Sequence, residues 1–251
     1  MRFSARHIAI TGGSGEMGRR IAGGLIEEGA SVTVFDRVPP DGLQARYLAC
    51  DLAEPEGLQA AGERLASEPF DTLINLAGVQ YFGPIEDEPP AQLARTLAIN
   101  LLAPIRLTQA VLPGMKARGE GQIVNVGSIF GSINFAHFAS YSSSKAGLRA
   151  FSQALRREVA GSGVDVTYVA PRAVRTAFNS AKVEQFAALT KMAMDDPGHV
   201  ANRIVDAIGR RRRDVYLGFP EAFFVRLNAI APTLVDRALA SDDRRVAQLF
   251  A

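Results

Sequence analysis

Three residues whose side chains can move protons lie near one another in the sequence. Tyr141 and Lys145 are four positions apart, and Ser128 precedes the tyrosine by thirteen. On a helix, residues four apart share a face, so the ammonium would lie close to the phenol. A neighbouring cation favours the phenolate, which makes Tyr141 a candidate proton donor and acceptor. The Ser128 hydroxyl is suited to hydrogen-bond the oxygen of a reacting carbonyl or alcohol.

A Tyr-x-x-x-Lys pair on its own is more often a solvated helix face, so its interpretation depends on a second motif. Near the N-terminus, the apolar run 7–10 ends directly in the glycine-rich sequence TGGSGEMG at 11–18, and apolar residues at helical spacing follow. This pattern predicts a strand, a tight turn and a helix. The spacing Gly13-x-Gly15-x-x-Gly18 fits the fingerprint in which glycines let the backbone approach a dinucleotide pyrophosphate at a helix N-terminus.

A carboxylate ends the next apolar run. Residues 31–35 predict a second strand, and Asp36 follows it, 21 positions after Gly15. At about this distance an acidic side chain meets the ribose hydroxyls of NAD, and it would repel the additional phosphate of NADP. NAD is therefore the expected cofactor and NADP the less favoured one. Arg37 is the opposing feature, because a basic residue there could engage that phosphate.

Apolar strands and helix-periodic segments continue to alternate along the chain. We expect strands at 72–75, 122–126 and 164–169, and helices at about 91–112 and around Tyr141. This alternation predicts an α/β fold with a doubly wound parallel sheet, the Rossmann fold, and helices on both faces. Ligands of such sheets bind beyond the carboxyl ends of the strands. Five candidate residues fall at these ends: Gly12, Asp36, Asn75, Ser128 and Pro171.

These residues and their order resemble the short-chain dehydrogenase/reductase family, in its compact branch of roughly 250 residues. Besides the glycine turn, Asp51-Leu52 resembles the pair that contacts adenine in that family, and NLAG at 75–78 resembles its Asn-Asn-Ala-Gly motif. PRAVRT at 171–176 resembles the segment that binds the nicotinamide carboxamide. The resemblance implies hydride transfer between a nicotinamide ring and a carbonyl or secondary alcohol.

The resemblance also implies roles for individual residues. The catalytic set is Asn100, Ser128, Tyr141 and Lys145, in which Asn100 helps to hold a proton-relay water and Lys145 also holds the nicotinamide ribose. The expected cofactor-binding residues are Gly12, Ser14, Gly15, Glu16, Met17, Gly18, Asp36, Arg37, Asp51, Leu52, Asn75, Ala77, Gly78, Tyr141, Lys145, Pro171, Val174 and Thr176.

Three positions depart from the family pattern. Glu16 occupies the sixth position of the turn, where the compact branch has glycine, and Gly15 carries the spare glycine instead. Leu76 replaces the second asparagine of the Asn-Asn-Ala-Gly motif. Arg172 replaces the glycine after Pro171, which would reshape the nicotinamide side of the site.

Composition sets further bounds. A chain of 251 residues that is 47% hydrophobic and 22% charged is expected to fold as one domain over 1–251. No uninterrupted apolar run of about 18 residues is present, and the N-terminus leads straight into the first predicted strand, so we expect a cytoplasmic protein. Cys50, the single cysteine, is expected to be a packed core thiol. The three histidines lack ligand-like spacing, and no metal site is expected.

The last third of the chain carries two features that the expected chemistry does not require. Residues 173–196 predict a substrate lid, and 219–251 a C-terminal helical extension rich in large apolar side chains. Phe223, Phe224, Leu227, Ile230 and Leu234 are expected to cover the substrate mouth or a neighbouring subunit. Docking on a membrane surface, aided by the basic run 210–213, is the alternative. A net charge of +2 does not favour nucleic acid.

The function expected from the sequence is an NAD-dependent oxidoreductase, forming a homodimer or homotetramer and acting on a small apolar ketone or alcohol. Apolar residues are expected to line the substrate pocket: Val79, Tyr81, Phe82, Ile129, Phe130, Phe135, Phe138, Phe178 and Phe186. A catalytically idle NAD-binding sensor or scaffold is the alternative, although it would not need the catalytic set. An enoyl reductase of the same fold would need a wider tyrosine–lysine spacing.

Overall fold

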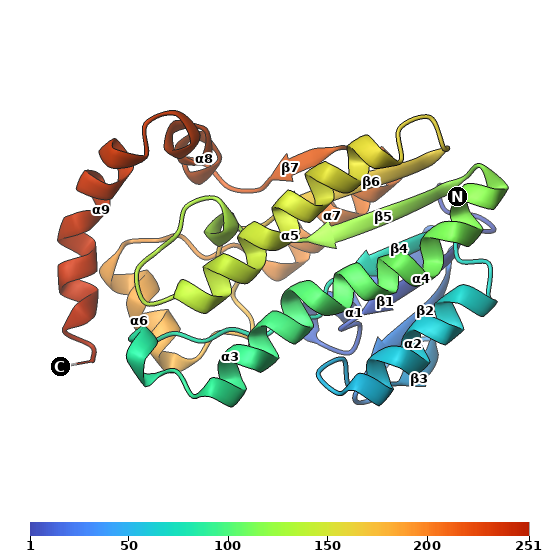
Figure 1. Ribbon diagram of the computed structural model, residues 1–251, viewed down its shortest axis with the longest axis horizontal. Helices are drawn as coiled ribbons and strands as arrows, with labels where there is room; N and C mark the ends of the chain where they lie inside the picture. The colour runs from blue at the N-terminus through green and yellow to red at the C-terminus, as the bar shows by residue number, and fades with distance from the viewer. Residues whose placement is uncertain (251) are drawn as a thin grey trace.

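A single parallel sheet organises the molecule (Figure 1). The computed structural model describes residues 1–250, leaving aside the side chains at 221 and 222; Ala251, the last residue of the predicted extension, lies outside the described residues. The sheet order is β3-β2-β1-β4-β5-β6-β7. The strands are β1 (His7–Thr11), β2 (Ser31–Asp36), β3 (Arg46–Ala49), β4 (Thr72–Asn75), β5 (Gly121–Val126), β6 (Val164–Ala170) and β7 (Asp214–Tyr216).

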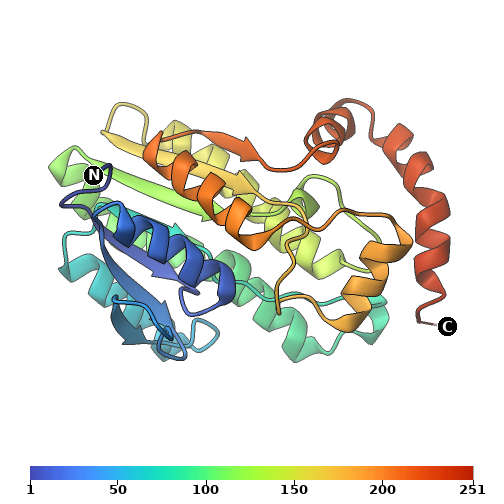
Figure 2. The same cartoon turned by 180° about the vertical axis from the view of Figure 1, so that it is seen from behind.

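Helices cover both faces of the sheet. Figure 1 shows α2, α4 and α5 on one face, and Figure 2 shows α1 and α7 on the other. These helices are α1 (Glu16–Glu27), α2 (Pro55–Ser67), α4 (Ala103–Arg118), α5 (Ala139–Glu158) and α7 (Pro197–Gly209). The architecture confirms the doubly wound parallel sheet predicted from the sequence.

Burial on both faces explains why the central strands are apolar throughout instead of alternating. In β1, Ile8 and Ile10 pack against the α1 and α7 side, while Ala9 packs against the α2 and α4 side. All three are fully buried. The parallel register places Thr11 beside both Phe35 and Asn75, so the ends of three strands meet at one edge.

The helix expected at about 91–112 is longer and changes form along its length. It runs from Pro90 to Arg118 as α3 (Pro90–Leu97), a π-helical turn at Ala98–Leu102, and α4. It ends at Gly119, whose φ of +67° suits glycine. By length and composition this segment could cross a membrane. Here it serves as a core helix, since one side packs on the sheet and on α2.

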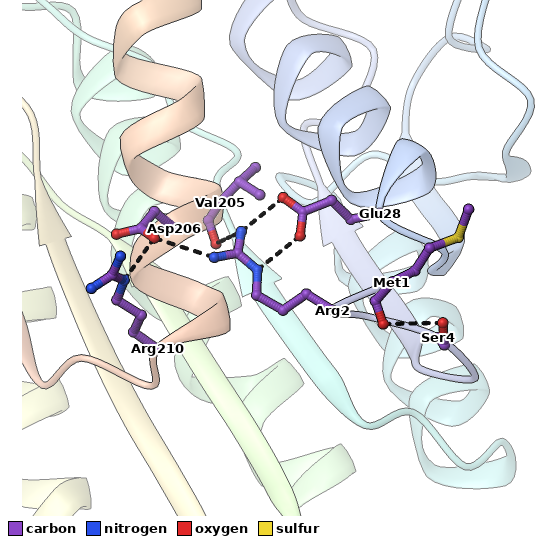
Figure 3. Close-up of polar contacts among 7 residues, drawn as sticks. All are labelled: Met1, Arg2, Ser4, Glu28, Val205, Asp206 and Arg210. Atoms are coloured by element: carbon purple, nitrogen blue, oxygen red, sulfur yellow. Dashed lines mark hydrogen bonds and ion pairs between the residues drawn. The ribbon is translucent and has the colours of Figure 1, made fainter.

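The N-terminal residues fasten together the two helices of the α1 and α7 face (Figure 3). The guanidinium of Arg2 donates two hydrogen bonds of 2.8 Å to Glu28, just beyond α1, and one of 3.2 Å to Asp206 on α7. Arg210, the residue just after α7, donates to the same Asp206 oxygen at 2.8 Å. These pairs are partly exposed, so each contributes little alone, but together they link the ends of two core helices.

Beyond the carboxyl ends of the strands lies a cover made from α6 (Ala181–Leu189), α8 (Glu221–Ile230) and α9 (Pro232–Ala247). We name residues 173–196 the lid and residues 219–250 the C-terminal arm. Figure 2 shows α9 lying beside α6 at the outer end of the molecule, and their contacts agree. Both pack on one apolar cluster that also contains Tyr141.

The arm differs in detail from the expectation. Its apolar stretch forms two helices, α8 and α9, with Ala231 between them. Five side chains were expected to cover the substrate mouth or a neighbouring subunit. Leu227 packs against the apolar cluster, but the other four are exposed and do not cover the mouth within this chain: Phe223, Phe224, Ile230 and Leu234. The contact is made instead by Val225, Val235, Val246 and Phe250. The sequence shows which residues are apolar but not which face of each helix meets the body.

The basic run 210–213 forms the turn between α7 and β7. Arg210 pairs with Asp206 at 2.8 Å, and Arg211 pairs with Asp165 at 2.7 Å. These pairings reduce the charge that the run could present to a membrane surface.

Candidate active site

One cavity of about 520 Å³ opens at the carboxyl ends of the strands. Its size falls within the usual range for small-molecule sites. It brings together three of the four predicted catalytic residues and all the predicted cofactor residues except Asn75. The predicted residues that line it are Gly12, Ser14, Gly15, Glu16, Met17, Gly18, Asp36, Arg37, Asp51, Leu52, Ala77, Gly78, Ser128, Tyr141, Lys145, Pro171, Val174 and Thr176.

The proton-transferring residues come from α5 and from the end of β5. Tyr141 and Lys145 occupy adjacent turns of α5, and Lys145 Nζ lies 5.9 Å from the centre of the Tyr141 ring. Ser128 follows β5 and caps the short 3-10 turn Ile129–Gly131 by accepting from the Phe130 amide at 3.2 Å. All three side chains line the cavity although their residues are largely buried.

Buried amides fix α5 against the sheet. Asn75 Nδ2 donates to Asn125 Oδ1 at 2.8 Å, and Asn125 Nδ2 donates to Ser152 Oγ at 2.8 Å. Ser152 Oγ in turn donates to the Leu148 carbonyl at 2.7 Å. This chain of bonds connects β4, β5 and α5, and it lies two turns along α5 from the catalytic pair. Because buried polar groups are costly to leave unpaired, the connection holds the helix at one depth and rotation.

Close backbone packing holds Ser128 beside Tyr141. A Cβ at Gly131 would lie 2.5 Å from the Lys145 carbonyl carbon, so the 3-10 turn can rest directly on α5 only with glycine there. Lys145 Nζ donates to the Val126 carbonyl at 3.0 Å, which ties the lysine to the end of β5.

Burial sets the ionisation of the catalytic pair. Removal from water raises the pKa of Tyr141 to about 12, and the hydrogen bond with Ser128 opposes this only in part. Burial also lowers the pKa of Lys145 to about 8. The structure therefore does not bear out the expectation that the tyrosine pKa is lowered. Desolvation disfavours both charged forms.

The glycine-rich turn forms an anion-binding cradle. Gly12 has a φ of +69°, and a Cβ there would lie 2.8 Å from Ala77 Cα. At Gly18 a Cβ would lie 2.2 Å from the Gly12 carbonyl oxygen. Gly15 caps α1 without a side-chain hydrogen bond, so the first amides of the helix remain available to a ligand. These features fit the pyrophosphate of a dinucleotide.

The expected ribose-binding carboxylate lies next to that turn. Asp36 Oδ2 accepts from the Ser14 amide at 2.9 Å, and Oδ1 accepts from the Arg37 amide at 2.7 Å. Ser14 Oγ also donates to the Val38 carbonyl at 2.6 Å. The carboxylate is thus held in one orientation at the cavity wall.

Two predicted site residues lie outside the cavity. Asn75 is buried in the sheet and bonds to Asn125, so it supports the site without facing it. Asn100 is also fully buried: its Oδ1 accepts from the Val79 amide at 2.9 Å, and its Nδ2 donates to the Val79 carbonyl and to Ser144 Oγ. The side chain of Asn100 therefore fixes the loop after β4. It lies on the π-helical turn, where a widened helix brings it towards that loop.

Fewer residues line the apolar wall of the cavity than the sequence predicted. Val79, Phe130, Phe178 and Phe186 line the cavity. The other five predicted wall residues do not: Tyr81, Phe82, Ile129, Phe135 and Phe138. The rings of Phe135 and Phe138 stand behind Phe130, with centres 4.6 and 4.8 Å from it. They support the wall from the second layer.

Several residues that line the cavity were not anticipated. Gln80 joins the loop after β4 to the lid by donating to the Phe178 carbonyl at 2.9 Å. Arg95 reaches the cavity from α3, and its Nε is buried without a hydrogen-bond partner among the described residues. Neither belongs to a recognisable motif. The one sequence feature that could have indicated a place for Arg95 near the site is its position five residues before Asn100.

Cys50 packs against the apolar core, as expected for a core thiol, but it is only half-buried and also lines the cavity. Its strand is near the sheet edge and ends beside the cofactor cradle. Partial burial, with Asp36 and Asp51 nearby, raises the pKa of the thiol to about 11, which disfavours the reactive thiolate. Among the described residues, no group of three or more histidine, cysteine, aspartate or glutamate side chains could hold a metal ion.

Fold and site together define an oxidoreductase of the nicotinamide-dependent class. A family model described as short chain dehydrogenase matches residues 6–187. The chain belongs to this family.

Individual relatives agree. The chain is 31% identical to ketoacyl reductase HetN from a Nostoc species, over 94% of this chain and 88% of that one. It is 33% identical to mouse dehydrogenase/reductase SDR family member 7B, over 78% of this chain but only 63% of the relative. A solved short-chain dehydrogenase from Sphingobium yanoikuyae in complex with NADPH shares 25% identity, with a TM-score of 0.78 over 92% of this chain and 95% of that one.

Proposed function

We propose that the protein reduces a carbonyl group, or oxidises the corresponding secondary alcohol, on a hydrophobic small molecule. The observation that carries the proposal is the presence of Ser128, Tyr141 and Lys145 in one cavity with the glycine-rich cradle. 3-Oxoacyl thioesters are the first substrates to test. A relative is named as a ketoacyl reductase, and Phe130, Phe178 and Phe186 provide an apolar wall for an acyl chain.

The residues divide the reaction between them. A nicotinamide cofactor bound in the cavity supplies or accepts the hydride. Ser128 Oγ orients the substrate oxygen by a hydrogen bond. Tyr141 Oη donates a proton to that oxygen during reduction and accepts it during oxidation. The Tyr141 phenol is protonated at neutral pH, and its raised pKa extends this well into the alkaline range, which suits a general acid. The ammonium of Lys145 stabilises the phenolate that forms as the proton leaves.

For the cofactor, we propose a preference for NAD over NADP. Asp36 offers a fixed carboxylate to ribose hydroxyls, and the same charge opposes a 2′-phosphate. Arg37 and the NADPH-bound relative argue in the other direction. Comparison of kcat/KM for the two reduced cofactors tests the preference. Asp36→Ser should shift it towards NADPH, and a wild-type enzyme that already prefers NADPH would contradict it.

The function itself is tested by following cofactor absorbance at 340 nm with acetoacetyl-CoA, longer 3-oxoacyl thioesters and simple aromatic ketones. Activity should increase with apolar chain length. If polar ketones react faster than acyl thioesters, the substrate class is wrong. Cofactor binding without turnover on any carbonyl or alcohol would instead favour the non-catalytic sensor.

We also propose that the chain is a homo-oligomer that associates through the outer surfaces of α3, α4 and α5. Support comes from three exposed leucines, of which Leu93 and Leu97 lie on α3 and Leu102 lies on the π-helical turn that follows it. Sedimentation of the wild type and of Leu97→Glu tests the assembly. A monomeric wild type would reject it.

A further inference from the structure

Arg172 makes contacts that the glycine usual at this position in the family cannot make. It follows Pro171 at the nicotinamide side of the cavity. Its Nε donates to Asp195 Oδ2 at 2.9 Å, and its Nη2 donates to Asp195 Oδ1 at 2.7 Å. Only 13% of the arginine side chain and 17% of the aspartate side chain are exposed. Such two-pronged pairing is among the strongest and most directional of side-chain contacts.

The same guanidinium reaches the root of the C-terminal arm. Arg172 Nη1 donates to the Phe219 carbonyl at 3.2 Å. The stem of the side chain lies on Gly218, where a Cβ would be 2.7 Å from Arg172 Cδ. Gly218 also has a φ of +102°. One side chain therefore joins the loop after β6, the end of the lid and the start of the arm.

Asp195 also brings the two ends of the lid together through its backbone. Its amide donates to the Ala173 carbonyl at 2.9 Å, and its carbonyl accepts from the Arg175 amide at 3.0 Å. The lid between them is therefore a loop closed at its base, with the Arg172 and Asp195 side chains paired across that base.

At its far end, the lid packs against the other end of the arm. Lys182 Nζ lies 5.0 Å from the centre of the Phe250 ring. Val183 and Phe186 share an apolar cluster with Val235 and Val246 of α9. Phe186 also lines the cavity. The lid is thus held between the arm and the reacting groups, with contacts to the arm at both ends.

We propose that Arg172 is a positioning residue that latches the lid to the root of the C-terminal arm, so that lid and arm close over the substrate as one unit. The substrate part of this proposal rests on the proposed function. The latch itself can be measured without catalysis. Because the latch lies at the base of the lid, its loss should free the lid while leaving the adenosine end of the cofactor site intact.

The test compares Arg172→Ala and Asp195→Asn with Arg175→Ala, which removes a neighbouring lid arginine whose side chain makes one long bond of 3.5 Å to the Met194 carbonyl. Tryptic cleavage after Lys182 and Lys191, followed by mass spectrometry, reports lid opening. We expect both latch variants to be cleaved at these sites about tenfold faster than the wild type, and the control within about twofold. The KM for acetoacetyl-CoA should rise about tenfold, while the Kd for NADH, from its fluorescence, changes less than about threefold.

Arg172→Lys separates the latch from a simple charge effect. Lysine retains the charge but cannot form the two-pronged pair, so it should behave as alanine does. It also carries the test if Arg172→Ala fails to fold. Unchanged cleavage at both lysines in the latch variants would overturn the proposal, as would an equal acceleration at every tryptic site of the chain. If the wild type turns over no carbonyl substrate, the proposed function fails, but the cleavage rates still decide the latch.

Discussion

The catalytic floor and the cover of this site are built in different ways. We use catalytic floor for Ser128, Tyr141, Lys145 and the glycine-rich turn, and cover for the lid with the C-terminal arm. The floor is held by buried hydrogen bonds and by backbone contacts that admit only glycine. The cover is held mainly by apolar packing, with a few hydrogen bonds and the Arg172–Asp195 pair at its base, and several of its large apolar side chains face solvent.

This difference suggests a division of labour. Proton transfer needs groups fixed to within fractions of an ångström, which directional bonds to a rigid sheet provide. A cover has to open and close, and it should be drawn from the less stable part of the structure. Substitutions in the floor should therefore affect chemistry and cofactor binding most strongly, whereas substitutions in the cover should affect substrate affinity and local stability.

The largest expected effect is on turnover when the proton donor is removed. Tyr141→Phe should lower kcat by about 10³-fold, because the proton has no comparable donor in the cavity. Cofactor binding, measured by NADH fluorescence, should be nearly unchanged. Tyr81→Phe is the matched control: among the described residues Tyr81 Oη bonds only to the Pro84 carbonyl, at 3.3 Å, and its loss should leave kcat within about twofold. Near-normal turnover in Tyr141→Phe would remove the tyrosine from the mechanism.

The next effect should be on the glycine-rich turn. A Cβ at Gly18 meets the Gly12 carbonyl oxygen, whereas a Cβ at Gly15 has only ordinary contact at 3.5 Å with the same atom. Gly18→Ala should weaken NADH binding about 100-fold and destabilise the fold by roughly 2 kcal/mol, since backbone has to move. Gly15→Ala should leave the melting temperature unchanged. If Gly18→Ala and Gly15→Ala have the same melting temperature, close packing of the helix on the turn is not the reason for glycine at position 18.

A smaller effect concerns the stability cost of the buried lysine. Its pKa is lowered from 10.5 to about 8, so below pH 8 the folded protein carries a buried charge that the unfolded chain leaves in water. Lys145→Met should therefore be more stable than the wild type by on the order of 1–3 kcal/mol at pH 7. As pH rises from about 8 to 10.5, the unfolded chain binds more protons than the folded one, so the wild type should gain relative stability and the difference should vanish. Urea unfolding across this range checks both the sign and the pH window. If Lys145→Met is less stable than the wild type at pH 7, this account is wrong.

The smallest effect is expected in the arm. Phe250 contacts the rings of Phe82 and His137 with centres 5.0 and 4.8 Å apart, while Phe223 is 55% exposed and meets only Phe224 among the ring contacts of the described residues. Phe250→Ala should cost about 1 kcal/mol and raise the substrate KM about threefold. Phe223→Ala should change neither quantity. Equal effects would mean that the arm has no preferred docking face.

The floor was largely predictable because its spacing has a physical meaning. A spacing of four on a helix places Tyr141 and Lys145 on the same face. The glycines of the cofactor turn, Gly12 and Gly18, lie where two backbone segments pack closely. For two residues the spacing did not predict which way the side chain points. Asn75 and Asn100 occupy the right segments, but their side chains turn away from the cavity to satisfy buried backbone and side-chain partners. A sequence gives the residue type at a position, but it does not show which buried groups that side chain will hydrogen-bond in the folded protein.

The cover was predictable as an element but not in its contacts. Apolar composition indicated helices at the C-terminus, yet which side of α8 and α9 would pack depended on distant partners such as Phe82 and Phe186. Arg172 was identified as a departure from the family pattern, but its pairing with Asp195 required the fold. The pKa of Tyr141 also required the fold, because burial of the phenol raises it and the sequence does not show how deeply that side chain is buried.

The chain of bonds from Asn75 through Asn125 to Ser152 has a consequence for protein engineering. A graft of the Tyr141 to Lys145 segment onto another sheet would transfer the reactive groups. It would not transfer the hydrogen bonds that fix the distance of α5 from the strands. An activity transplant should therefore carry the two asparagines and the serine as well. Mutant libraries built to alter substrate choice should leave these three positions constant and randomise residues of the cover.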